Sequence, residues 1–253
     1  MPAPTLNPES LPRLPHWPGV RAFCSTRAGG VSKPPFDSLN LGLHVGDAAE
    51  DVAENRQRLA QAWGAKPVFL NQVHGTDVIQ LNNHSPDMQA ADACWTQQPS
   101  VACTIMVADC LPVLFYQAQA RVVAAAHAGW RGLSAGVLEN TLQALSEFAA
   151  PGTWRVWLGP CIGPQAFEVG EDVRTAFASQ APADGVFKAL PTPGKYLADL
   201  PALARQRLQQ AGVVHLEGND SSPEWCTFSQ TQLYFSHRRD GRSGRFAAGI
   251  TLA

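Results

Sequence analysis

Apolar residues follow two kinds of pattern along this chain, and the first is helical. In residues 51–63 and 134–148 they recur every three or four positions among polar residues, which is typical of amphipathic helices. Two further helices are expected over residues 171–178 and 200–211. Asp199 suits the N-cap of the last helix and Gly212 suits the position just beyond its end.

The second pattern consists of short apolar runs that are rich in β-branched and aromatic residues and are bounded by turn-forming residues. These runs predict strands over residues 20–26, 67–70, 78–81, 101–107, 112–116, 121–126, 153–158, 213–216 and 246–252. The runs between residues 67 and 126 follow one another closely, and we expect them to form one continuous sheet system.

Strands and helices are interspersed without a flexible linker, a change in composition or an internal repeat. The pattern therefore predicts a single domain of mixed α/β type (α+β) over residues 1–253. The Pro-rich residues 1–18 are expected to form an extended lead-in to it. With 253 residues, 45% of them hydrophobic, the chain has enough apolar mass for a substantial core.

Composition narrows the class of partner. The 19 Lys and Arg residues against 21 Asp and Glu residues give a net charge of −2, so the chain lacks a broad basic field for nucleic acid, and we expect small substrates. No apolar run approaches the roughly 20 residues that span a bilayer, and the N-terminal residues lack the features of a secretion signal. The six cysteines form no C-x-x-C pair, which suits reduced thiols in a cytoplasmic protein without a membrane partner.

Several motifs are missing. The chain contains no phosphate-binding G-x-x-x-x-G-K-[ST], no strand-bound G-x-G-x-x-G, no H-E-x-x-H and no P-C-x-x-C. NTP hydrolysis and dinucleotide redox chemistry are therefore disfavoured, and the lack of any H-x-H pair disfavours a multinuclear copper cluster. Residues 132–136 match the G-x-S-x-G nucleophile elbow, but several residues separate Ser134 from the preceding strand, so we expect Ser134 to be a helix N-cap.

Three polar residues stand at the ends of apolar runs: His74, Cys110 and His127. Each meets Gly or Pro within two residues, and strand ends that open into loops are where sites are usually built. Two imidazoles and one thiolate are the three protein ligands expected of a catalytic zinc that keeps a fourth position open. The three lie too far apart in the sequence for a compact zinc motif, so a buried cysteine with two structural histidines is the alternative interpretation.

A series of sequence blocks then appears in a characteristic order. They are STRAGGVS (25–32), LNLGLHVGD (39–47), ENR (54–56), NQVHG (71–75), ADA (91–93), VADCLP (107–112), AAHAGWRG (125–132), LGPCIG (158–163) and the segment 238–246 with RRD and GRF. Together they resemble the bacterial YfiH family, also called laccase-domain or polyphenol-oxidase proteins. One departure is His237, where the family commonly has Tyr.

The resemblance implies a mixed β-sandwich flanked by helices, a fold shared with some cysteine hydrolases. It also implies Zn²⁺ held by His74, Cys110 and His127 as the catalytic centre. The implied activity is phosphorolysis of purine nucleosides (adenosine, inosine, guanosine and methylthioadenosine), with adenosine deamination as a companion activity and purine nucleosides and phosphate as the partners. The family is also described genetically as a peptidoglycan editing factor.

Five further residues are candidates for substrate contacts. Phosphate must lie near C1′ of the ribose during phosphorolysis, and Arg56 and Arg131 are the expected phosphate or substrate contacts; a solvated helix face is the alternative for Arg56. Asp109 is a possible acid or base, or a residue that caps a turn at a strand end. Asn40 and His44 lie in a Gly-rich loop that we expect to line the pocket.

Two other classes of function remain open at this point. A metal-free cysteine hydrolase would use Cys110 as its nucleophile and His127 as its base. A non-catalytic partner of cell-wall precursor enzymes would instead depend on surface residues. A copper polyphenol oxidase is disfavoured, because the sequence lacks the paired histidines of a copper cluster.

Overall fold

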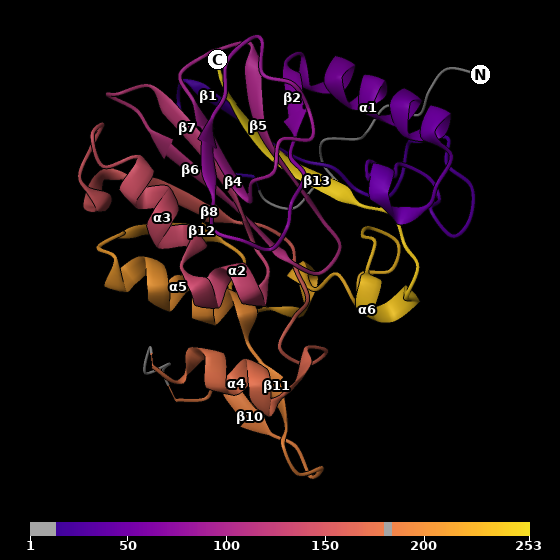
Figure 1. Ribbon diagram of the computed structural model, residues 1–253, viewed down its shortest axis with the longest axis vertical. Helices are drawn as coiled ribbons and strands as arrows, with labels where there is room; N and C mark the ends of the chain where they lie inside the picture. Colours follow the sequence, from indigo (N-terminus) through magenta and orange to yellow (C-terminus); the bar gives the residue numbers. More distant parts are fainter. Residues whose placement is uncertain (1–13, 180–183) are drawn as a thin grey trace.

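Two β-sheets packed against each other form the centre of the molecule (Figure 1). A computed structural model describes residues 14–179 and 184–253, so residues 1–13 of the expected Pro-rich lead-in lie outside the described residues. The four-stranded sheet has the order β1-β13-β5-β2, with the bounds Val20–Cys24, Phe246–Leu252, Val101–Val107 and Lys66–Phe69. The six-stranded sheet has the order β12-β8-β6-β7-β4-β3, with the bounds His215–Gly218, Arg155–Leu158, Leu111–Gln117, Val122–Ala128, Ala93–Thr96 and Val78–Gln80.

The central strands are apolar along their whole length because both of their faces are covered. In β5, Cys103 and Ile105 share a buried cluster with Val123 and Ala125 of β7, which places this cluster between the two sheets. Met106 of β5 belongs instead to the cluster on the other face of its sheet. This alternation of side chains between two covered faces explains the continuous apolar runs in the sequence.

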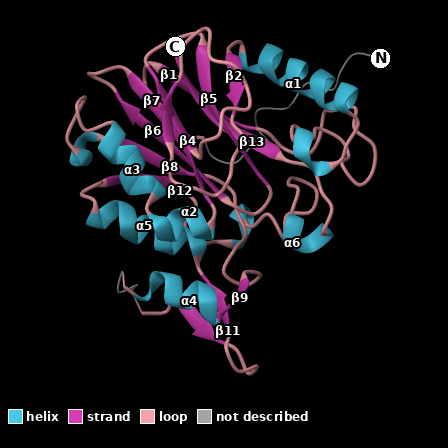
Figure 2. Ribbon diagram, viewed as in Figure 1, coloured by secondary structure: helices cyan, strands magenta, loops and turns pink. Residues whose placement is uncertain are grey.

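Helices cover the outer faces of the two sheets (Figure 2). Helix α1 (Ala49–Trp63) packs its residues Leu59 and Trp63 on the four-stranded sheet. The six-stranded sheet is covered by α2 (Trp130–Ala135), α3 (Val137–Ala144) and α5 (Leu200–Gln210). The predicted mixed β-sandwich flanked by helices is therefore confirmed.

Smaller elements lie at one end of this sandwich. A three-stranded sheet has the order β10-β11-β9, with the bounds Phe187–Ala189, Lys195–Ala198 and Glu168–Gly170. It is accompanied by helix α4 (Glu171–Ala178), as Figure 1 shows at the lower end of the molecule.

The remaining short helices are η2 (Leu43–Val45), η3 (Pro151–Thr153), η4 (Pro223–Trp225) and α6 (His237–Asp240).

Two expectations about this fold were wrong. The strands between residues 67 and 126 do not form one sheet. The chain crosses between the four-stranded and the six-stranded sheet after β2, after β4 and again in the short connection between β5 and β6. The helix expected over residues 134–148 is two helices, since Gly136 adopts a φ of 104° that ends α2 and precedes α3. Ser134 consequently lies inside α2, where its hydroxyl donates to the carbonyl of Arg131, and it is neither an N-cap nor a nucleophile elbow.

The predicted bounds of three elements and one predicted helix cap were confirmed. Helix α4 and strands β5 and β13 have the expected bounds, and Asp199 caps α5 by accepting a hydrogen bond from the Ala202 amide at 2.9 Å. All six cysteines are free thiols. Within residues 14–179 and 184–253, no helix combines the length and the apolar character that crossing a membrane requires.

Candidate metal centre

Three side chains from separate parts of the chain meet at one edge of the two sheets. Cys110 directly precedes β6, and His127 lies near the end of β7, which pairs antiparallel with β6. The hairpin between β6 and β7 therefore brings the start of one strand beside the end of the other. His74 arrives from the loop between β2 and β3.

The potential ligand atoms of His74, Cys110 and His127 all lie within 4.8 Å of one another. Nε2 of His74 is 3.8 Å from Sγ of Cys110, and the two imidazole rings stand at 73° with centroids 4.8 Å apart. His127 is buried, Cys110 is half-buried and His74 is exposed. In the part of the chain that the structure describes, this is the one group of three or more such side chains that could hold a metal ion.

Asp92 organises this cluster from behind. One of its carboxylate oxygens accepts a hydrogen bond from Nδ1 of His127 at 2.8 Å, which leaves Nε2 of that ring for a ligand. The same carboxylate accepts the amides of Val73, His74 and Gly75 at 3.1, 2.9 and 2.7 Å. A buried carboxylate behind a ligating histidine is the usual arrangement in metal sites, because it fixes the tautomer and the orientation of the ring.

The charges of the cluster suit a thiolate ligand. Burial raises the pKa of the Cys110 thiol, but the positive charge of His127 and hydrogen bonds from both imidazoles outweigh it and lower the pKa to about 6. Burial lowers the pKa of His127, but the charge of Cys110 and the hydrogen bond to Asp92 raise it to about 9. At pH 7 the metal-free pair is therefore a Cys110 thiolate and a His127 imidazolium. A metal ion would take the place of the proton on His127, and the donors would then be one thiolate and two imidazoles, which fits a three-residue zinc centre.

Gly129 permits this close approach. A Cβ atom at this position would lie 2.9 Å from Sγ of Cys110 and 2.9 Å from Cδ2 of His74. Real Cβ contacts are longer than this, so any side chain here would push two of the three ligands apart. The same glycine is the N-cap of α2, which links the start of that helix to the cluster.

The cluster opens into two adjoining cavities. The larger has a volume of about 310 Å³ and is lined by the cluster together with His44, Gln72, Met106, His237 and Arg245. The smaller has a volume of about 190 Å³ and is lined mainly by aromatic and aliphatic side chains, among them Trp130, Ile162, Phe167 and Leu200. Both cavities share Ala108, Cys110 and His237, so they meet beside the thiol.

Comparison with known proteins agrees with this architecture. A family model described as "Multi-copper polyphenol oxidoreductase laccase" matches residues 21–253. The chain belongs to this family. The purine nucleoside phosphorylase PA4543 of Pseudomonas aeruginosa is 50% identical over 94% of this chain and 97% of its own length, and the purine nucleoside phosphorylase YfiH of Escherichia coli is 49% identical over 94% and 98%.

Solved structures of the family have the same fold. Protein NMB0706 of Neisseria meningitidis superposes with a TM-score of 0.88 at 43% identity, covering 96% of this chain and 98% of its own. YlmD of Geobacillus stearothermophilus superposes with a TM-score of 0.86 at 34% identity, covering 94% of each chain. The resemblance to the YfiH family is thereby confirmed.

The two arginines that the sequence suggested as substrate contacts do not line either cavity. The guanidinium of Arg56 lies 3.9 Å from the centroid of the Phe69 ring, pairs with Asp87 at 3.1 Å and donates to the carbonyl of Leu41. The guanidinium of Arg131 lies over the Trp130 ring on the exposed side of α2. Arg56 therefore joins α1 to Phe69, Asp87 and Leu41. This role differs from the phosphate contact that the sequence led us to expect.

The other three candidates lie near the cluster in different ways. His44 lines the larger cavity, and burial followed by the charges of Arg245 and Arg56 lowers its pKa. Asp109 borders the smaller cavity, but its carboxylate accepts the hydroxyl of Thr227 at 2.6 Å and the amide of Arg238 at 2.7 Å. This places Asp109 as a support for α6 rather than as a free acid or base.

Asn40, a residue of the Gly-rich loop, is completely buried and lines neither of the two cavities. Its side chain accepts the amides of Gly42 and Arg245, both at 2.9 Å, and donates to Asp47 at 2.8 Å. The family's loop of residues 39–47 is therefore tied to the segment that begins β13.

Sequence reasoning assigned no role to Asp92 or Arg245, which the structure places beside the cluster. Asp92 lies between the apolar residues of the block ADA and is completely buried. A buried carboxylate needs a charged or hydrogen-bonding partner, so an Asp among apolar residues is a sequence signal for such a partner. Gln72, which precedes His74 in the same block, forms two hydrogen bonds of 2.8 Å with the backbone of Met106 and so holds the loop to the end of β5.

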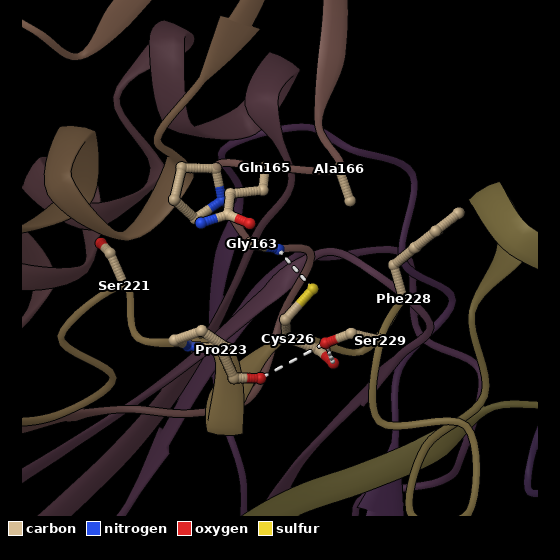
Figure 3. A pocket seen from close by; sticks show the side chains of 9 residues that line it. Gly163, Gln165, Ala166, Ser221, Pro223, Cys226, Phe228 and Ser229 are labelled. Carbon is tan, nitrogen blue, oxygen red and sulfur yellow. Dashed lines mark hydrogen bonds between the residues drawn. The ribbon is translucent and has the colours of Figure 1, made fainter.

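A third cavity of about 250 Å³ shares no lining residue with the other two cavities. Figure 3 shows Cys226 in its wall, with Sγ directed at the amide of Gly163, which donates to it at 3.2 Å. Phe228 and Ser229 lie on one side and Ser221 on the other. Cys226 therefore does not contribute to the metal centre.

Proposed function

We propose that this protein is a zinc-dependent purine nucleoside phosphorylase that also deaminates adenosine. The observation that carries the proposal is the convergence of His74, Cys110 and His127 on one point in the wall of a cavity of about 310 Å³, next to a second, aromatic cavity. The purine nucleoside phosphorylases of P. aeruginosa and E. coli, which are about half identical to this chain over nearly its whole length, support the choice of substrate.

Zinc is favoured over copper by the chemistry of the donors. Two imidazoles and one thiolate, held by a carboxylate behind one imidazole, are typical of a zinc site with an open position. A multi-copper site requires further imidazoles for additional ions, whereas the described residues bring together one three-ligand group. Zinc, when bound, supplies a Lewis acid and lowers the pKa of a water ligand to roughly 7.

Phosphorolysis exchanges the bond from C1′ to the purine for a bond from C1′ to phosphate, and the protein must hold both groups. One phosphate oxygen forms a bond to C1′ while the bond from C1′ to the purine nitrogen breaks, and its electron pair leaves with the purine. Hydrogen phosphate and nucleoside thus give ribose 1-phosphate and the purine, which takes up the proton of the phosphate. Trp130 and Phe167 offer flat apolar surfaces on which a purine stacks, and these lie in the smaller cavity.

Deamination of adenosine uses the same cavities with water in place of phosphate. Water adds to C6 of adenine and ammonia leaves, which gives inosine. The nucleobase must then present C6 rather than its glycosidic nitrogen to the cluster, so the nucleoside binds in a second orientation. The two reactions differ in their need for phosphate, and this difference separates them experimentally.

The test incubates zinc-loaded protein with inosine and phosphate, and separately with adenosine without phosphate. We expect hypoxanthine and ribose 1-phosphate in the first reaction, and inosine and ammonia in the second. Cys110→Ala should abolish both and reduce bound zinc below one equivalent per chain, while the exposed His84→Gln serves as the matched control with both activities intact. Failure of the wild-type protein with one zinc per chain to release any purine would contradict the proposal.

One observation also favours a second candidate, a metal-free cysteine hydrolase. The arrangement in space is that of a cysteine hydrolase, with Cys110 as the nucleophile, His127 as the base and Asp92 as the carboxylate that orients the base. The Cys110 thiol also has a lowered pKa. Metal analysis separates the two candidates. Hydrolysis by the metal-free protein, with a substrate-derived adduct on Cys110 detected by mass spectrometry, would support this candidate and contradict the zinc enzyme.

A further inference from the structure

We infer that Arg245 binds the phosphate co-substrate in the larger cavity, beside the cluster of His74, Cys110 and His127. This inference rests on the proposed function for the identity of the anion, and it assigns the anion's place in the site. It replaces Arg56, whose guanidinium is paired with Asp87.

Arg245 is a half-buried cation with no carboxylate of the described residues in salt-bridge contact, although the more distant charges of Cys110 and Asp109 act on it. It lines the larger cavity, and in residues 14–179 and 184–253 no ion pair joins it to an acidic side chain. The hydrogen bonds of its guanidinium to protein come from Nη1, which donates to the carbonyls of Ser243 and Gly244 at 2.9 and 3.0 Å. Nε and Nη2 of its planar fork are thus left for a two-point contact with an anion.

The backbone around Arg245 is fixed in place. Its amide donates to the side chain of Asn40, its carbonyl accepts the amide of Leu41, and its aliphatic stem lies against Gly42. A Cβ at Gly42 would lie 2.8 Å from Cγ of Arg245, so the glycine makes room for this stem. A guanidinium held in this way loses little conformational freedom when it binds, which favours affinity.

Among the described residues, the rest of the larger cavity contains no carboxylate that would repel an anion, and its one anionic group, the Cys110 thiolate, would become a ligand when zinc binds. Four histidines and one arginine are among its lining residues, and none of them is acidic. Gln72 cannot compete for the guanidinium, because both ends of its amide are bonded to the backbone of Met106. His44 and Arg245 come from two segments that Asn40 joins by hydrogen bonds to the amides of Gly42 and Arg245.

The smaller cavity has a different character. Its two charged side chains are hydrogen-bonded to other protein groups: Asp109 accepts the amide of Arg238 in α6, and the Arg238 guanidinium donates to the carbonyls of Ala166 and Glu168. This leaves an aromatic compartment for the base and a cationic compartment for phosphate, which meet at Ala108, Cys110 and His237. The reaction requires phosphate to attack C1′ as the base leaves, and two adjoining compartments provide for both groups.

The first experiment measures binding rather than turnover. Inorganic phosphate is titrated into metal-free and zinc-loaded protein and followed by ³¹P NMR. We expect Arg245→Gln to weaken phosphate binding about tenfold or more in both forms, since a charge-assisted two-point contact is lost. Arg242→Gln is the matched control, because Arg242 lies in the same segment but donates to the carbonyl of Gly46, away from the cavity.

Steady-state kinetics give the second readout. Arg245→Gln should raise the KM for phosphate in the phosphorolysis of inosine, while the KM for inosine and the deamination of adenosine without phosphate stay within about twofold of the wild type. Arg245→Lys keeps the charge without the fork and should be intermediate. Thermal unfolding is compared for all variants, and if Arg245→Gln does not fold, Arg245→Lys supplies the comparison.

The outcomes separate this inference from the proposed function. Unchanged phosphate affinity in Arg245→Gln, or equal losses in phosphorolysis and deamination, would overturn the inference even if the wild type releases purine. Phosphate binding that depends on Arg245, in a wild type that releases no purine, would overturn the proposed phosphorolysis and leave the anion site standing.

Discussion

The carboxylate of Asp92 lies 2.8 Å from Nδ1 of His127 and also accepts three backbone amides of the loop that carries His74. One buried side chain therefore orients two of the three potential ligands. His74 itself has a φ of 61°, an uncommon conformation for this residue, and its amide is among those that Asp92 holds. The arrangement of the cluster thus depends on a residue that is not itself one of the three potential ligands.

Asp92→Asn is expected to weaken zinc binding about 10- to 100-fold, as for other residues that support a ligating histidine. The amide is neutral and cannot accept all four hydrogen bonds as the carboxylate does. Competition with a chromogenic chelator measures the affinity. Asp87→Asn is the control, because Asp87 pairs with Arg56 and accepts the Phe69 amide outside the cluster. Equal zinc affinity in Asp92→Asn and the wild type would show that the carboxylate does not support the ligands.

Cys110 is expected to be the thiol that reacts fastest with iodoacetamide in the metal-free protein. Its pKa of about 6 makes it mainly thiolate at pH 7, whereas burial raises the pKa values of Cys24 and Cys103. Because the thiolate is the reactive form, the rate should fall as the pH decreases through 6 and level off above it. Peptide mass spectrometry locates the label.

Bound zinc should protect Cys110 from this labelling, since the ligand sulfur is then occupied. Labelling that is equally fast with and without one equivalent of zinc would argue that Cys110 is not a ligand.

Gly129→Ala is expected to disrupt the cluster through its added Cβ, which would lie 2.9 Å from both Cys110 Sγ and His74 Cδ2. We expect less than one zinc per chain and a free energy of unfolding lower by about 1–3 kcal/mol, as for other overpacked sites. Gly152→Ala is the matched control, because its Cβ would meet its nearest neighbour at an ordinary 3.5 Å. Metal analysis and urea unfolding check both variants. A Gly129→Ala protein with full zinc content would show that the cluster does not require a glycine at this position.

Trp130→Ala tests the aromatic cavity. Loss of one stacking surface should raise the KM for inosine about threefold to tenfold and leave the KM for phosphate unchanged. Phe228→Ala, in the separate third cavity, is the aromatic control and should change neither constant. A rise in the KM for phosphate alone would place the base elsewhere.

Local pattern predicted the elements whose conformation depends on their own residues. Strands β5 and β13 and helix α4 have the predicted bounds, and Asp199 caps α5 as expected. The pattern could not divide the strands between two sheets, because a strand buried on both faces has the same apolar run in either sheet. It also missed the break at Gly136, since the apolar spacing continues across a residue whose φ is positive.

The sequence by itself determined the chemistry that this protein carries: two imidazoles and a thiolate at the ends of apolar runs, within blocks that identify the family. Only the tertiary structure decided which charged groups face the site. It paired Arg56 with Asp87, placed Arg245 in a cavity that no carboxylate lines, and placed Asp92 behind His127. The physical reason is that residue type is encoded locally, whereas the partner that satisfies or frees a charge comes from distant segments brought together by packing.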